Sequence, residues 1–227
     1  ASNGSTINQP VTFLGFGSTA SRFLRLTTNP LFTVTSSNVV FDSIYCNNNL
    51  LDGYTVHYTA GDQQQALNCR FEFPSSNAGF RFLKFNNDVG THFFGSNIGL
   101  KTTGTTNYGI GLSTDAADQA RRFSDCFTNG GPFIDVANGR ATLINGGGLG
   151  PIAMTSASRG YNSQGAYYGT TPQVDIFGRA HIFSGNFFPG STVNLSTGSA
   201  GCIVTNNNAG QFTDVGVGNV LANNSTA

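Results

Sequence analysis

Charged residues and long apolar runs are both scarce in this 227-residue chain. Charged side chains make up 10% of the residues, and eleven Lys and Arg balance eleven Asp and Glu. A chain without net charge has no broad electrostatic attraction for nucleic acid or for an anionic membrane. No apolar run approaches the roughly 20 residues that span a bilayer. We therefore expect neither nucleic acid binding nor membrane insertion.

Residues that favour helices are also rare. The chain has one glutamate, Glu72, two lysines, Lys84 and Lys101, one methionine and no tryptophan. In their place it has 30 glycines, 20 phenylalanines and long tracts of Asn, Ser and Thr. Phenylalanine and β-branched residues suit pleated, half-buried surfaces, whereas Gly and Asn suit turns with positive φ. This composition predicts an all-β protein.

The four cysteines carry no metal-binding signature. None forms a C-x-x-C pair or has a histidine at ligand spacing. Asp-x-Asp calcium loops and phosphate-binding loops are absent as well, so no cofactor is expected. An even count permits two disulfides, and the alternative is four free thiols packed as small core residues. The cysteines are Cys46, Cys69, Cys126 and Cys202.

Short strand-like units recur along the chain. The segments 39–46 and 66–73 are similar units, each followed by turn residues, and Cys46 and Cys69 occupy comparable places in them. Their separation, about two dozen positions, is typical of a solenoid, in which like positions on successive coils lie over one another. Asparagines at the turns can then form hydrogen-bonded ladders.

The spacing of the units decides between architectures. Strands of four to six residues separated by turns leave no room for the crossover helix of an α/β fold. We predict a right-handed parallel β-helix, with an antiparallel β-sandwich or jelly roll as the alternative. The expected organisation is a lead-in or cap over residues 1–35, the β-helix over 36–215 and a tail over 216–227.

The repeated units resemble a known family. The blocks at 37–49 and 66–71 are similar to coils of phage tailspikes and related pectate-lyase-like β-helix proteins, and the likeness covers about residues 35–215. It implies a homotrimer in the virion tail or an extracellular location. It also implies binding to bacterial surface polysaccharide, which many tailspikes cleave as hydrolases or lyases.

Catalytic candidates come from the few acidic residues. Glycoside hydrolysis usually needs two carboxyl groups, and some tailspikes carry catalytic aspartates three residues apart, a spacing that Asp115 and Asp118 match. The alternative is an exposed turn in which Asp115 caps a short helix and Asp118 pairs with an arginine. Glu72 should point outward, either as a general acid or paired with Arg70, Arg81 or Lys84.

The segment 156–168 is the best candidate for glycan binding. We expect a loop that projects from the solenoid, and such loops commonly carry function. Its aromatic rings can stack on sugars, and its polar side chains can bond to hydroxyl groups. Alternatively, the tyrosines cover the coil or pack against another subunit. The candidate residues are Arg159, Tyr161, Asn162, Tyr167 and Tyr168.

Three functions follow from these observations. The first is a tailspike or tail-fibre component that binds host polysaccharide. The second is a polysaccharide depolymerase that uses Asp115, Asp118 or Glu72. The third is a purely structural capsid or fibre protein with no sugar site. No nucleophile motif accompanies His57, His92 or His181, so the sequence does not point to a Ser-His-Asp triad.

Overall fold

The protein is all-β. Every pairing among the described strands is parallel, and no helix occurs in the described part of the chain. This arrangement contradicts the antiparallel sandwich or jelly roll that the sequence left open. The computed structural model describes residues 4–16, 22–25, 29–48, 54–72, 81–85, 93–101, 108–112, 121–129, 134–136, 142–149, 152–154, 156, 158–169 and 173–226.

Three parallel sheets contain the strands, and we name them A, B and C. Sheet A has seven strands in the order β1-β4-β7-β10-β13-β16-β19. They are β1 (Ser5–Ile7), β4 (Phe32–Val34), β7 (Tyr54–Tyr58), β10 (Arg81–Phe85), β13 (Tyr108–Leu112), β16 (Ile134–Val136) and β19 (Ile152–Met154).

Sheet B has ten strands in the order β2-β5-β8-β11-β14-β17-β20-β23-β25-β27. They are β2 (Val11–Leu14), β5 (Val39–Asp42), β8 (Gln65–Leu67), β11 (Phe94–Ser96), β14 (Arg121–Ser124), β17 (Thr142–Asn145), β20 (Asn162–Gln164), β23 (Ile182–Ser184), β25 (Ile203–Thr205) and β27 (Val220–Ala222).

Sheet C follows the order β3-β6-β9-β12-β15-β18-β21-β24-β26-β28, and β22 also pairs with β24. Its strands are β3 (Arg22–Arg25), β6 (Tyr45–Asn48), β9 (Arg70–Glu72), β12 (Gly99–Lys101), β15 (Phe127–Asn129), β18 (Gly148–Leu149), β21 (Tyr167–Tyr168), β22 (Gln173–Arg179), β24 (Phe187–Ala200), β26 (Asn208–Asp214) and β28 (Ser225–Thr226).

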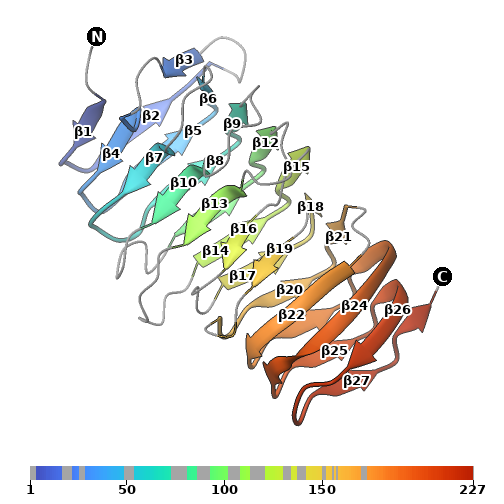
Figure 1. The fold of residues 1–227 in the computed structure, drawn as a ribbon. Helices are drawn as coiled ribbons and strands as arrows, with labels where there is room; N and C mark the ends of the chain where they lie inside the picture. Colours follow the sequence, from blue (N-terminus) through green and yellow to red (C-terminus); the bar gives the residue numbers. More distant parts are fainter. Residues whose placement is uncertain are drawn as a thin grey trace.

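From β1 to β21 the chain visits the three sheets in rotation, and from β22 onward its strands belong to sheets B and C. Strands β4, β5 and β6 belong to sheets A, B and C, and β7, β8 and β9 then repeat the cycle one layer further on. We call one such cycle a coil. The coils lie in sequence order along one axis, with the N-terminus at one end and the C-terminus at the other (Figure 1). Because consecutive strands join different sheets, parallel pairing needs no crossover helix here.

Most described corners between sheets B and C are a single residue with positive φ followed by an inward-facing residue; before β18 both Gly146 and Gly147 have positive φ. Glycine and asparagine tolerate this conformation best, which explains their frequency at the turns. The next residue begins sheet C, so the corner is tight. The positive-φ residues are Ser43, Asn68, Asn97, Asp125, Gly146, Gly165, Gly185, Asn206 and Asn223.

Coil length differs between the two ends of the chain. Arg70 pairs with Gly99, whereas Asn208 pairs with Ser225, a much shorter step along the sequence. The expected domain boundaries do not coincide with the ends of the stack. Strand β1 already pairs with β4, and β27 and β28 extend sheets B and C beyond residue 215.

The interior changes character along the axis. The N-terminal coils enclose aromatic rings, such as Tyr58 stacked on Phe85 with centroids 4.8 Å apart. Near the C-terminus the interior holds an asparagine ladder, as the sequence suggested. The backbone N–H of Asn186 donates to Oδ1 of Asn207 at 2.8 Å, and that of Asn207 donates to Oδ1 of Asn224 at 2.9 Å.

All four cysteines are free and buried, so the thiol alternative is confirmed. Burial raises the pKa of Cys69 to about 11 and that of Cys126 to about 12, which keeps both thiols protonated and unreactive. The stacking inferred for Cys46 and Cys69 is wrong. Cys46 pairs with Phe71, while Cys69 lies at the corner just before its strand.

Candidate functional site

The segment 158–168 forms part of the coil stack and not the projecting loop that the sequence suggested. Arg159 bridges to Arg179 in parallel, and β20 and β21 belong to sheets B and C. Gly160 and Gly165 have positive φ and turn the chain at the two corners. The inward, buried residues are Ser158, Tyr161, Ser163, Ala166 and Tyr168, and the outward ones are Arg159, Asn162, Gln164 and Tyr167.

Two of the tyrosines expected to contact sugar belong to the core. Tyr161 and Tyr168 are buried, and their hydroxyl groups lie 3.0 Å apart. The Tyr168 hydroxyl also lies 2.6 Å from Oγ of Ser163, and desolvation raises the pKa of Tyr168 to about 12. The ring of Tyr168 stacks on Phe188. Neither tyrosine ring therefore has a free face for a ligand. Of the two interpretations given above, the one in which the tyrosines pack on the coil applies to Tyr161 and Tyr168.

The other three candidates are outward positions of one coil, separated by two corners. Arg159 precedes the corner at Gly160, Asn162 lies on sheet B, and Tyr167 lies on sheet C beyond the corner at Gly165. The matching positions of the next coil follow the register Arg159–Arg179, Asn162–Ile182, Gln164–Ser184 and Tyr167–Phe187. We call this band of outward positions the paired-coil face. It is defined by Arg159, Asn162, Gln164, Tyr167, Arg179, Ile182, Ser184 and Phe187.

An aromatic pair lies at one end of the paired-coil face. The rings of Tyr167 and Phe187 have centroids 5.4 Å apart at an interplanar angle of 44°. The two residues are 47% and 39% exposed, so part of each ring is open to solvent. Exposed, adjacent ring faces on a rigid sheet form a platform on which the apolar face of a sugar can stack.

The aromatic column continues toward the N-terminus. Phe127 is 52% exposed and pairs with Gly148, which in turn pairs with Tyr167. A Cβ at Gly148 would lie 3.4 Å from the Phe127 ring, so the ring rests against bare backbone. Sequence reasoning missed Phe127 and Phe187. Both occupy the first outward position after a corner, a signal that is readable only once the register is known.

Glu72 is held by two donors. The Tyr45 hydroxyl donates to Oε2 at 2.6 Å, and Nε of Arg70 donates to Oε1 at 3.1 Å. The suggested pairing with Arg70 is therefore confirmed. A catalytic role for Glu72 stays a prediction. Asp115 and Asp118 lie outside the described residues.

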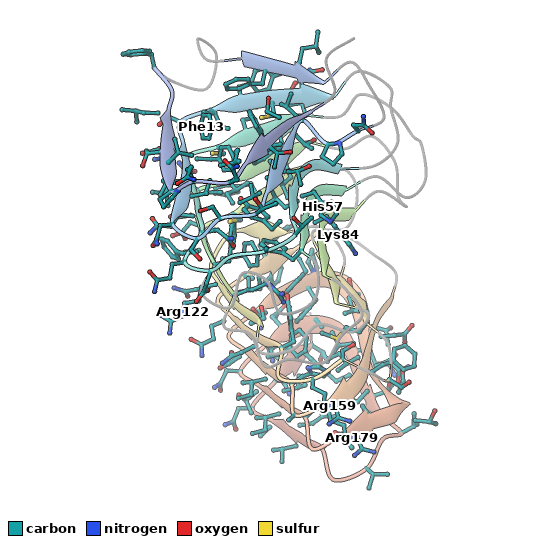
Figure 2. The ribbon with its side chains drawn as sticks, turned by 90° about the vertical axis from the view of Figure 1, so that its left-hand side faces the viewer. Phe13, His57, Lys84, Arg122, Arg159 and Arg179 are labelled. Carbon is teal, nitrogen blue, oxygen red and sulfur yellow. The ribbon has the colours of Figure 1, made fainter. Side chains whose placement is uncertain are left out.

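His181 is a buried core residue. Its Nδ1 accepts from the backbone N–H of Tyr161 at 3.0 Å, and Nε2 lies 2.8 Å from the carbonyl oxygen of Phe177, to which it donates as the neutral ring. Desolvation lowers the pKa of His181 to about 4, and the hydrogen bond to the Phe177 carbonyl partly offsets this shift by raising the pKa. His57 lies instead on the outer face of sheet A, in register with Lys84 (Figure 2), and His92 lies outside the described residues.

We expect the stability of the fold to depend on the protonation of His181. Its pKa is about 4 in the folded chain against 6.5 for the free residue, so the unfolded chain binds more protons between these values. The free energy of unfolding is therefore fully retained above pH 6.5 and falls as the pH drops toward 4. The loss from this group is at most about 3 kcal/mol.

Urea unfolding followed by circular dichroism at pH 4.5, 5.5 and 7 measures this effect. In His181→Gln the pH dependence of the unfolding free energy should become flatter than in the original chain. A slope that survives in the His181 variant would contradict the assignment.

Metal and membrane features are absent from the described residues. No group of three or more His, Cys, Asp or Glu side chains there could hold a metal ion. The same part of the chain contains no helix that is long and apolar enough to cross a bilayer.

Comparison with known proteins gives one structural neighbour. The chain is similar to the solved structure of Geobacillus virus E2 ORF18, with a TM-score of 0.53 and 15% sequence identity. The match covers 96% of this chain and 49% of that one, so the chain spans about half the length of its neighbour. No protein-family model and no curated protein matches the chain. At 15% sequence identity, this structural similarity shows a shared fold alone.

Proposed function

We propose that the chain is a component of a phage tailspike or tail fibre that binds host cell-surface polysaccharide. In this proposal the coils form a right-handed parallel β-helix, three chains assemble into a trimer, and the protein acts in the virion tail. The rotation of strands through three parallel sheets and the phage origin of the structural neighbour support the proposal. Assembly and location are part of the proposal and need their own measurements.

The observation that carries the proposal is the exposed ring pair of Tyr167 and Phe187 on sheet C. Sugars offer apolar ring faces to aromatic residues and hydroxyl groups to amides. Gln164 supplies an exposed amide on the same coil as Tyr167, whereas Asn162 is half-buried and its Oδ1 is buried. Because β-strands hold these side chains, little conformational entropy is lost when a ligand binds.

Alanine substitution of the ring pair tests the proposal. We expect Tyr167→Ala and Phe187→Ala each to weaken binding to the recognised polysaccharide about tenfold, because a stacking surface is lost. Phe94→Ala is the matched control, since Phe94 is 40% exposed on the outer face of sheet B, away from the ring pair. Glycan arrays and binding to whole bacterial cells provide the measurement.

Two results would contradict the proposal. One is polysaccharide binding that neither ring substitution affects more than Phe94→Ala does. The other is a monomer in light scattering that binds no bacterial polysaccharide. Scattering that shows an elongated threefold particle would support the assembly part of the proposal.

A further inference from the structure

One register position of sheet C forms a continuous column along the stack. It is the first outward position after the corner between sheets B and C, and we call it the sheet C column. Because its members all belong to one sheet at one register position, no corner separates them. The strands that carry them follow one another along the axis (Figure 1). Over the middle of the stack the members are Gly99, Phe127, Gly148, Tyr167, Phe187 and Asn208.

The exposed rings of sheet C follow this column and not the individual strands. Phe127, Tyr167 and Phe187 are the members with large exposed side chains. Along their own strands, the next outward positions after Tyr167 and Phe187 are Gly169 and Pro189, which carry no aromatic ring. From Phe127 to Phe187 the column crosses three strand spacings, about 14 Å. The rings therefore form a strip one ring wide that runs parallel to the axis of the stack.

Bare backbone lies between the rings and beside them. Gly148 occupies the column between Phe127 and Tyr167, where an added Cβ would lie 3.4 Å from Cδ1 of Phe127. Gly165 and Gly185 form the corners that precede the other two rings. An added Cβ at Gly165 would meet nothing within 4 Å, and one at Gly185 would meet only the backbone N of Gly165, at 3.9 Å. The glycines thus leave room along the strip for a chain-like ligand.

The strip is uncharged. From Phe127 to Ser225 the sheet C column holds no lysine, arginine, aspartate or glutamate. Nearer the N-terminus, the column residue Arg70 is neutralised by Glu72, with Nε 3.1 Å from Oε1. Asp125 is exposed at the corner before Phe127, and its carboxylate would repel an anion on the strip. An uncharged ligand therefore fits the strip better than an acidic one.

The width of the strip favours a saccharide over a protein partner. A stable protein interface buries about 800 Å² on each partner. A fully buried aromatic side chain contributes roughly 150–250 Å², so three half-exposed rings offer roughly 300 Å². A linear saccharide needs only a narrow surface. Its units advance along the chain by about one strand spacing, and each presents an apolar face to a ring.

We infer that an uncharged linear oligosaccharide lies lengthwise along the sheet C column. One sugar stacks on the ring pair of Tyr167 and Phe187, and another stacks on Phe127. Phe127 is thus a second stacking site, two strand spacings or about 10 Å from Tyr167. This inference rests on the proposed function, because it names the class of saccharide and the direction in which it crosses the ring pair.

Titration calorimetry with oligosaccharides of two and four units tests the inference. The uncharged probes are cello-oligosaccharides and N-acetylated chito-oligosaccharides, and the acidic probe is oligogalacturonate. We expect the tetramer of at least one uncharged series to bind at least about tenfold more tightly than its dimer, because only the tetramer reaches both stacking sites. The oligogalacturonate tetramer should bind at least about tenfold more weakly than that uncharged tetramer.

Substitution assigns the length dependence to Phe127. Phe127→Ala should lower the affinity for the tetramer to about that for the dimer, and change the affinity for the dimer by less than about twofold. Gly148→Val should act in the same way, because its side chain would displace the Phe127 ring and fill the surface beside it.

Gly99→Val is the matched control. Gly99 belongs to the same column but lies on the other side of Phe127, outside the strip, and an added Cβ there meets only Cγ of Arg70, at 3.8 Å. Valine suits a strand at both glycine positions, and circular dichroism verifies that each variant is folded. We expect Gly99→Val to change the affinity for either length by less than about twofold.

The possible failures are distinguishable. If Phe127→Ala affects dimer and tetramer equally while Tyr167→Ala still weakens binding to bacterial cells, the inference falls and the proposed function stands. If the oligogalacturonate tetramer binds as tightly as the uncharged ones, the assignment to uncharged saccharides is overturned. If no tetramer binds at millimolar concentration, the inference falls, and a protein that also fails to bind bacterial cells removes the proposed function with it.

Discussion

Replacing Gly178 by alanine should destabilise the protein by about 4 kcal/mol or more. Gly178 has a φ of +90°, and an added Cβ would lie 2.2 Å from the carbonyl oxygen of Ser158 and 2.9 Å from Nε2 of His181. The carbonyl belongs to backbone and cannot swing aside. The coils must therefore separate where the Arg179 N–H donates to the Ser158 carbonyl, and the His181 ring must move away from its bond to the Phe177 carbonyl.

Gly201→Ala is the matched control. Gly201 also has positive φ, at +64°, but an added Cβ there meets nothing within 4 Å. Its cost should be the backbone strain alone, about 1–2 kcal/mol. Urea unfolding followed by far-UV circular dichroism measures both, since the chain lacks tryptophan. Equal losses in the two variants would show that coil separation at Gly178 costs nothing.

The architecture was largely predictable because the signals for it are local. Short apolar strands and turn residues recur along the whole chain, and they led to parallel coils before any register was known. The register itself was not predictable. The coil that leads from Arg70 to Gly99 is far longer than the one from Asn208 to Ser225, so no fixed period connects like positions. This variation explains why Cys46 and Cys69 were aligned out of register.

The direction of side chains in the candidate site was also hidden from sequence reasoning. Simple strand alternation would place Arg159, Tyr161 and Ser163 on one face. The positive-φ residues Gly160 and Gly165 interrupt that alternation, so Tyr161 turns inward while Arg159 stays outside. Composition singled out this segment as a candidate, and the corner geometry decided which of its side chains reach solvent.

The polar interior near the C-terminus depends on complete hydrogen bonding, and Asn207 is its centre. Oδ1 of Asn207 accepts from the backbone N–H and from Nδ2 of Asn186, at 2.8 and 3.0 Å. Nδ2 of Asn207 donates to the carbonyl of Phe183 at 2.9 Å and to Oδ1 of Asn224 at 3.1 Å. The Asn207 amide thus connects three coils, and stacked amides of this kind reinforce one another.

Replacing Asn207 by alanine should therefore destabilise the fold by about 3–5 kcal/mol, because it leaves the buried backbone N–H of Asn186 without a partner and removes the amide bonds to Asn186 and Asn224. Asn206→Gly is the control. Asn206 is exposed with a φ of +56°, which glycine adopts without strain, so the change should stay within about 0.5 kcal/mol. The urea concentration at the unfolding midpoint, compared at constant m-value, measures the change in unfolding free energy for both variants. If Asn207→Ala lost no more stability than Asn206→Gly, water or backbone rearrangement would be satisfying those groups, and the ladder would contribute little to holding the coils together.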